Sequence, residues 1–186
     1  FEGLKKAYAN GIELRGKTLG VVGIGRIGQA TAKMALGLGM KVIAADSYID
    51  KVDVKVEFFD GQSITTTIVS QSLESLFKEA DFITLHVPAQ DGYIIGEKEL
   101  AIMKDGVGIV NCARGGVIDE VALVKALDSG KVLFAGLDVF ENEPTPEMTI
   151  LMNSKISLTP HIGAATAEAQ DRIGTELASQ IIGLLG

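Results

Sequence analysis

The chain has 186 residues, of which 47% are hydrophobic, with 22 glycines, four prolines and no tryptophan. That length and composition suit one globular domain with a sizeable core. A formal net charge of −7 and a pI near 4.9 leave no basic surface to neutralise a phosphate backbone, which argues against nucleic acid as a partner.

Targeting signals are not evident in the sequence. No apolar run approaches the roughly 20 residues of a membrane helix, and the first residues lack the charged, apolar and small-residue pattern of a secretion signal. We therefore expect no membrane partner and a cytoplasmic protein. The single cysteine, Cys112, cannot form an internal disulfide, in keeping with a reducing compartment. Phe1 in place of an initiator methionine indicates that more chain precedes this sequence.

The first regular pattern runs from residue 17 to residue 46. Residues 17–22 form a short apolar run that stops at glycines, and residues 27–38 carry apolar side chains at helical spacing. Residues 41–45 are a second strand of the buried type, ending at Asp46. Strand, turn, helix and strand make one βαβ unit, and parallel strands linked in this way imply a sheet covered on both faces.

The next segment departs from this alternation. Apolar residues alternate with charged ones over residues 52–58, and a second β-type run follows the Asp60-Gly61 turn at residues 64–69. We predict a β-hairpin there.

The rest of the chain returns to alternating helices and strands. We predict helices at 72–78, 97–103, 120–127 and 168–185, and strands at 81–86, 108–112, 133–138 and 156–159. Such alternation is typical of an α/β fold with a Rossmann-type doubly wound parallel sheet. Without repeats or linkers, residues 1–186 form a single domain in this interpretation.

A glycine-rich turn lies between the first strand and the first helix of the βαβ unit. Gly23 allows the tight turn, Gly25 lets the backbone approach a pyrophosphate, and Gly28 lets the helix pack against the strand. The start of the helix offers free amides and a positive dipole end to the phosphates. Asp46 can accept both ribose hydroxyls and would repel a 2′-phosphate, which favours NAD over NADP. The structural alternative is a packing turn beside a surface aspartate.

Four polar residues follow strands later in the chain: Arg114, Asp138, Glu143 and His161. Side chains at the carboxyl ends of strands in an open α/β sheet point into the crevice where ligands bind. Oxidising a hydroxyl needs a base, a cation for the charged oxygens of the substrate and a hydride acceptor. Histidine titrates near neutral pH and a neighbouring carboxylate orients its ring, while arginine can hold a carboxylate in bidentate fashion.

Each of these residues, taken singly, also has a plain structural interpretation, such as a surface arginine or a helix-capping aspartate. Their joint occurrence beside the glycine motif favours catalysis. We interpret His86, with Val87 and Pro88, as a wall of the cofactor cleft, since no carboxylate near it in sequence would activate it. Cys112 is expected to be a buried, inert thiol, and no His/Cys cluster has the spacing of a zinc site.

Five stretches match a known pattern: residues 16–28, 80–88, 111–119, 136–140 followed by Glu143-Pro144, and 159–163. Together they make the chain resemble the cofactor domain of the D-2-hydroxyacid dehydrogenases. The resemblance implies that Arg114 binds the substrate carboxylate and carbonyl oxygen, that His161 is the general acid/base, and that Glu143 pairs with His161. It also implies that Asp138 lies at the nicotinamide end of the cofactor.

The motifs and the resemblance together give a predicted NAD site. Its residues are Gly23, Gly25, Arg26, Ile27, Gly28, Asp46, His86, Val87, Pro88, Cys112, Ala113, Arg114, Asp138, His161, Ile162, Gly163 and Ala164.

Within the family, residues 111–116 and 164–170 are most similar to the phosphoglycerate dehydrogenase branch, which implies oxidation of D-3-phosphoglycerate in serine biosynthesis. Two alternatives stay open: another branch, such as a hydroxypyruvate/glyoxylate reductase or a D-lactate dehydrogenase, and a corepressor-like module that senses NAD. If the protein is an enzyme of any of these branches, we expect its substrate to be a small 2-hydroxy acid.

The chain departs from the family pattern in two ways. The stretch between Asp46 and Ser72 is longer than expected, and the substrate domain, which precedes and follows the cofactor domain in the family, is absent. Residues 1–10 resemble the end of the connecting helix. We therefore expect this chain alone to bind NAD with little or no turnover, and to form a homodimer through the cofactor domain, as similar domains do.

Overall fold

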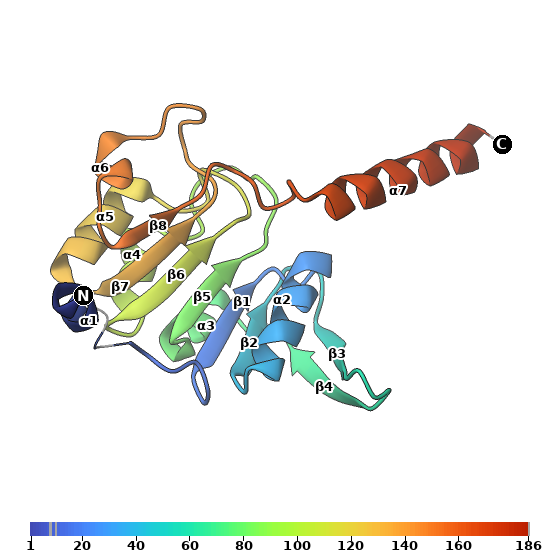
Figure 1. Ribbon diagram of the computed structural model, residues 1–186, viewed down its shortest axis with the longest axis horizontal. Helices are drawn as coiled ribbons and strands as arrows, with labels where there is room; N and C mark the ends of the chain where they lie inside the picture. Colours follow the sequence, from blue (N-terminus) through green and yellow to red (C-terminus); the bar gives the residue numbers. More distant parts are fainter. Residues whose placement is uncertain (8, 10, 186) are drawn as a thin grey trace.

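The computed structural model describes residues 1–7, 9 and 11–185, and its centre is a six-stranded parallel sheet (Figure 1). The strands follow the order β2-β1-β5-β6-β7-β8. They are β1 (Thr18–Val22), β2 (Lys41–Ala45), β5 (Phe82–Leu85), β6 (Val107–Asn111), β7 (Val132–Leu137) and β8 (Ile156–Leu158). Because β1 is flanked by β2 on one side and β5 on the other, the direction of strand addition reverses at β1. The predicted doubly wound sheet is confirmed.

The predicted helices are all present, with their ends shifted by one or two residues. They are α2 (Arg26–Gly37), α3 (Leu73–Glu79), α4 (Glu97–Ile102), α5 (Glu120–Ser129) and α7 (Ala167–Leu185). The expected connecting helix corresponds to α1 (Glu2–Ala7), with residues 8 and 10 outside the described part. Helix α6 (Met148–Leu151) was not predicted, because a helix of four residues is too short to show periodicity.

Most of the buried side chains fall into two large clusters that hold the layers together, beside a small third one of Ala35, Met40 and Phe82. Helices α3, α4 and α5 cover one face of the sheet, where the side chains of Phe77, Leu123 and Leu127 pack with strand residues such as Ile83 and Ile109. These side chains are almost completely removed from water, so their burial stabilises this layer through the hydrophobic effect.

The predicted hairpin is also confirmed, as β3 (Lys51–Glu57) paired with β4 (Ser63–Val69). Its side chains Val54 and Ile68 are buried with Val21 and Ala44 in a second cluster that includes α2. The hairpin thus extends the α2 layer beyond the β2 edge of the sheet (Figure 1). A single parallel bridge, between Ser70 and Ala44, continues the sheet past β2.

Helix α7 differs from the others because it extends away from the sheet (Figure 1). Its apolar side chains Ile173, Leu177 and Ile181 recur at the spacing of an amphipathic helix. They are exposed, and no residue of α7 is buried. Among the described residues, no helix combines the length and the apolar character that crossing a bilayer requires.

The strand ends are in register across the sheet. Paired residues at this edge are Val22 with Ala45 and with Leu85, Leu85 with Asn111, Asn111 with Leu137, and Leu137 with Leu158. The residues that follow each strand therefore meet along one edge, where ligands bind in open α/β sheets. All the predicted site residues belong to the segments that begin there.

Candidate functional site

The glycine turn is shaped by the close approach of backbone atoms. Gly23 has a φ of +89°, and a Cβ there would lie 2.5 Å from the carbonyl oxygen of His86. A Cβ on Gly28 would lie 2.1 Å from the carbonyl oxygen of Gly23. Only glycine fits at these positions, and both geometries agree with the tight turn and close helix packing expected from the motif.

Gly25 differs from its two neighbours in the motif, since a Cβ there would meet nothing within 4 Å. It precedes α2, whose start has no side-chain cap, and Arg26 and Ile27 beside it are exposed. An uncapped helix start offers amides and a positive dipole end to an anion. The residues present therefore fit the pyrophosphate of a dinucleotide.

Asp46 follows β2 and faces the glycine turn. Its Oδ2 accepts a hydrogen bond from the amide of Ile24 at 2.8 Å, and its Oδ1 accepts from the amides of Tyr48 at 2.8 Å and Ile49 at 3.1 Å. A carboxylate offers about four lone-pair positions, so Asp46 both braces the turn and keeps capacity for a ribose hydroxyl. The sequence predicted a carboxylate that accepts both ribose hydroxyls; its three hydrogen bonds to backbone amides were not predicted.

The segment that carries Arg114 is held by a buried amide side chain. Asn111 donates from Nδ2 to the carbonyl of Arg114 at 3.0 Å, and its Oδ1 accepts from the amide of Ala113 at 3.0 Å. Ala113 is buried, whereas the Arg114 side chain is exposed and donates to the carbonyl of Ala113 at 2.6 Å. No carboxylate of the described chain forms a salt bridge with Arg114, which leaves the guanidinium available to an anionic substrate.

The prediction that Cys112 is buried was wrong. Strand β6 ends at Asn111, so Cys112 lies beyond the strand at the mouth of the crevice and is exposed. Partial desolvation and the charge of Asp138 raise the pKa of its thiol, which leaves it a weak nucleophile.

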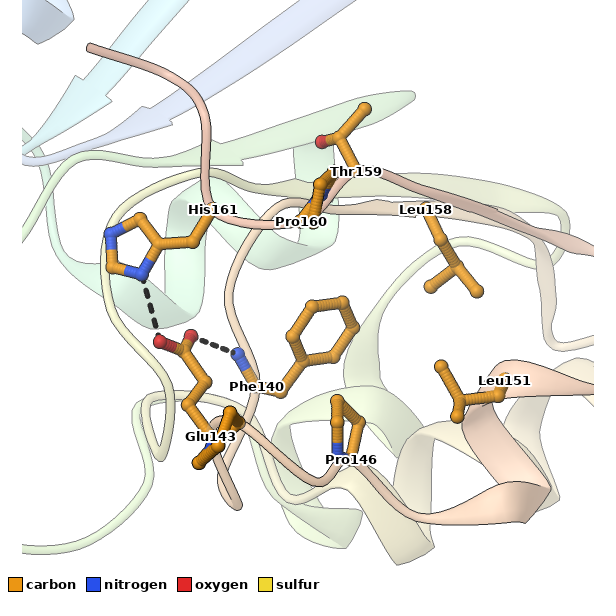
Figure 2. A pocket seen from close by; sticks show the side chains of 9 residues that line it. Phe140, Glu143, Pro146, Leu151, Leu158, Thr159, Pro160 and His161 are labelled. Carbon is orange, nitrogen blue, oxygen red and sulfur yellow. Dashed lines mark hydrogen bonds and ion pairs between the residues drawn. The ribbon is translucent and has the colours of Figure 1, made fainter. Parts of the chain in front are cut away.

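His161 and Glu143 form a direct pair (Figure 2). The Nδ1 atom of His161 lies 2.8 Å from Oε2 of Glu143, and Oε1 of Glu143 accepts from the amide of Phe140 at 2.9 Å. The hydrogen bond to His161, together with that from Phe140, lowers the pKa of the Glu143 carboxyl. Because Nδ1 is engaged, the ring nitrogen that points away from Glu143 is the one that can exchange a proton with a substrate.

The backbone of His161 adopts an unusual conformation that Asp138 holds in place. His161 has a φ of +55°, a left-handed value that non-glycine residues rarely adopt. Asp138 is buried and accepts hydrogen bonds from Oγ1 of Thr159 at 2.6 Å and from the amides of Ile162 and Gly163 at 2.9 and 2.8 Å. Burial raises the pKa of Asp138, but these hydrogen bonds and the nearby His161 lower it overall.

His86 lies at the end of β5 beneath the glycine turn. Its Nε2 is 3.1 Å from Oγ1 of Thr84, and burial lowers the pKa of the imidazole. The carbonyl of His86 and the side chain of Val87 are the atoms that a Cβ on Gly23 would strike, while Pro88 is exposed. This placement agrees with a wall of the cleft. Ala164 lies exposed beyond the His161 loop.

A cavity of about 390 Å³ opens behind the His161–Glu143 pair. Figure 2 shows that Phe140, Pro146, Leu151, Leu158 and Pro160 surround it. It lies on the Glu143 side of the imidazole, away from the free ring nitrogen. Among the described residues, no group of three or more His, Cys, Asp or Glu side chains is arranged to hold a metal ion.

Three supporting residues escaped the sequence analysis: Asn111, Thr159 and Glu120. The signal for Asn111 was present, since a polar residue ending a buried strand must find hydrogen-bond partners. The hydrogen-bond partners of Thr159 and Glu120 lie 21 residues away in the chain, so no local pattern marked them.

The sheet order, the glycine turn and the position of the His161–Glu143 pair on the same edge are those of a dinucleotide-binding α/β domain. The family model described as "D-isomer specific 2-hydroxyacid dehydrogenase, NAD binding domain" matches residues 2–163. The chain therefore belongs to the D-isomer specific 2-hydroxyacid dehydrogenase family, as its NAD-binding domain.

Two curated relatives are similar at comparable levels. A hydroxypyruvate reductase of Thermotoga maritima is 50% identical over 187 residues, covering 98% of this chain and 57% of the relative. A D-3-phosphoglycerate dehydrogenase of Methanocaldococcus jannaschii is 49% identical over 173 residues, covering 92% of this chain and 32% of the relative. The chain thus spans 57% of the length of the first relative and 32% of the second.

A solved structure shows the same fold. The D-lactate dehydrogenase of Aquifex aeolicus, complexed with NAD and lactic acid, has a TM-score of 0.75 and 32% sequence identity, and the match covers 99% of this chain and 60% of the other.

Proposed function

We propose that the whole protein oxidises D-3-phosphoglycerate to 3-phosphohydroxypyruvate with NAD, and that residues 1–186 are its cofactor domain and carry its catalytic side chains. The observation that carries the chemistry is the His161–Glu143 contact of 2.8 Å on the sheet edge that also bears the glycine turn. The choice of substrate is supported by residues 111–116 and 164–170, and by the 49% identity to a relative named for this reaction.

Reduction of hydroxypyruvate or glyoxylate is the second candidate. It is favoured by the 50% identity to a hydroxypyruvate reductase, of which this chain covers the larger share. Both candidates use the same acid/base histidine, the same cation and the same kind of cofactor. They differ in what is attached to C2 besides the carboxylate: a phosphorylated carbon in D-3-phosphoglycerate, a hydroxylated carbon in hydroxypyruvate and no further carbon in glyoxylate. In this proposal the protein groups that recognise this difference lie in a substrate domain outside residues 1–186.

The residues of this chain have distinct tasks in the oxidation. His161 accepts the proton of the C2 hydroxyl at Nε2 while Nδ1 stays on Glu143, whose carboxylate stabilises the resulting imidazolium. Arg114 holds the substrate carboxylate through its forked N–H groups. The bound NAD supplies the acceptor for the hydride that leaves C2. The substrate thus loses one proton, to His161, and one hydride, to NAD, and becomes a ketone.

The glycine turn, with Gly25 and the start of α2, holds the pyrophosphate, and Asp46 selects NAD by receiving a ribose hydroxyl and repelling a 2′-phosphate. His86, Val87, Pro88, Cys112 and Ala113, with Ile162, Gly163 and Ala164, line the rest of the cofactor groove. A homodimer through this domain is part of the same proposal.

Two measurements test the proposal. Calorimetric titration of this chain with NAD and with NADP should show saturable binding that prefers NAD, and Asp46→Ala should weaken NAD binding by about 10-fold. Equal affinity for both cofactors would contradict the role of Asp46. Turnover of the whole protein should be highest with D-3-phosphoglycerate, and a higher kcat/KM for hydroxypyruvate or glyoxylate would establish the second candidate instead.

A further inference from the structure

Glu120 and Glu141 are joined by two hydrogen bonds between backbone and carboxylate. The amide of Glu141 donates to Oε1 of Glu120 at 2.8 Å, and the amide of Glu120 donates to Oε1 of Glu141 at 3.0 Å. Glu120 is buried at the first position of α5, whereas Glu141 lies in the segment after β7 and is exposed. This reciprocal contact fixes the backbone two residues before Glu143.

The same segment is supported from a second direction. A Cβ on Gly115 would lie 1.8 Å from the carbonyl oxygen of Phe140, so the two backbones are in direct contact. The amide of Phe140 in turn donates to Oε1 of Glu143 at 2.9 Å. Glu120 and Gly115 therefore hold residues 140–141 in place, and those residues set the position of the Glu143 carboxylate.

The burial of the Glu120 carboxylate does not favour the stability of the fold. Its Oε2 atom is buried and has no hydrogen-bond partner in the described chain, which destabilises the folded state. Burial raises the pKa of Glu120; the hydrogen bond from Glu141 opposes this, and the charges of Glu141 and Glu147 add to it. The start of α5 is capped by Asp119, whose Oδ1 accepts from the amide of Ala122 at 2.9 Å, so the carboxylate of Glu120 does not serve as the N-cap.

We propose that Glu120 is a positioning residue for the reaction: it anchors the backbone of Glu141 so that Oε2 of Glu143 stays on Nδ1 of His161. This inference rests on the proposed acid/base role of His161. Glu120 touches neither substrate nor cofactor, and it acts through the 140–143 segment. Residues at strained or poorly satisfied positions commonly serve function at a cost in stability.

Three substitutions separate positioning from a general structural effect. Glu120→Ala removes the acceptor for the Glu141 amide, and Glu120→Gln keeps it. Glu97→Ala is the matched control, because Glu97 is also the first residue of a helix, α4, but is exposed, and the hydrogen bonds of the 140–143 segment are made to other residues.

Nitrogen NMR of this chain in alkaline buffer reports which ring nitrogen of His161 carries the proton, and the chain has only two histidines to assign. We expect wild type, Glu120→Gln and Glu97→Ala to hold the proton on Nδ1, facing Glu143. Glu120→Ala should show the tautomer mixture of a free imidazole. In the whole enzyme, Glu120→Ala should lower kcat about 10- to 100-fold with the KM for NAD changed by less than about twofold.

Each outcome decides the inference. If Glu120→Ala is folded and keeps both the Nδ1 tautomer and the wild-type kcat, the inference is wrong. If that variant does not fold, Glu120→Asp, which withdraws the carboxylate by one methylene, is measured in its place with the same expectations. If the wild-type whole protein oxidises no 2-hydroxy acid, the proposed function fails, and the NMR measurement alone then decides whether Glu120 positions the pair.

Discussion

The glycine turn and the His161 loop lie on the same edge of the sheet but are held by different means. Gly23 and Gly28 shape their turn through backbone contacts that only glycine permits, without any charged side chain except Asp46. The His161 loop depends on carboxylates from other segments: Asp138 holds its backbone and Glu143 holds its ring. The cofactor half is therefore shaped by close backbone contacts at glycines, and the catalytic half by carboxylates that accept hydrogen bonds from the loop.

The largest expected effect follows from removing the base. Asparagine tolerates left-handed φ values, so His161→Asn should keep the backbone at +55° while losing the imidazole. In the whole enzyme, kcat should fall about 100- to 10,000-fold, the usual range for a general base. Calorimetry on this chain should show an NAD affinity close to that of wild type. Near-normal turnover across the pH range would rule out the role of His161.

Two glycine substitutions test whether the turn is set by the chain itself or by its ligand. Gly23→Ala should lower the free energy of unfolding by about 1–3 kcal/mol through backbone strain alone, with the contact to His86 adding to it. Gly25→Ala should leave the free energy of unfolding within about 0.5 kcal/mol of wild type, because the space around it is empty.

The NAD affinity of the Gly25→Ala variant tests the role of this position in cofactor binding. Gly25→Ala should weaken NAD binding by about 10-fold or more, since in the proposed site the added methyl group would occupy the space assigned to the pyrophosphate. Urea unfolding and calorimetric titration measure the two effects. A Gly25→Ala chain that binds NAD as wild type does would place the cofactor elsewhere.

Asp138 gives the stability of the His161 loop a dependence on pH. Asp138→Asn should cost about 1–3 kcal/mol at neutral pH, because an amide nitrogen replaces one of the oxygens that accept from Thr159, Ile162 and Gly163. The pKa of Asp138 is lowered in the folded chain, so its contribution to stability is complete above the unfolded value of about 4 and is lost below it. Urea unfolding at neutral and acid pH should show the difference between wild type and variant shrinking in acid. A constant difference would contradict this account.

The difference between the glycine turn and the His161 loop also explains which parts of the fold and of the site could be predicted from the sequence. The glycine turn, Asp46 and every strand of the sheet follow from local spacing and periodicity, because each is a property of a few consecutive residues. The pairing of Glu143 with His161 was inferred only through the family resemblance. The bracing by Glu120 and Thr159, and the positive φ of His161, depend on contacts across the fold and had no local signal.

The smallest effect is expected for the contact between α7 and the glycine turn. Arg26 donates from Nη1 to Oε1 of Glu176 at 3.0 Å, but the two side chains are 89% and 52% exposed, and no residue of α7 is buried. An exposed pair of this kind contributes little, so Glu176→Gln should change the free energy of unfolding by less than about 0.5 kcal/mol. Releasing Arg26 beside the start of α2 should leave the NAD affinity of this chain unchanged or slightly higher. A loss of more than about 1 kcal/mol in urea unfolding would show that α7 is part of the folded core, and that the cofactor half also depends on a contact 150 residues away.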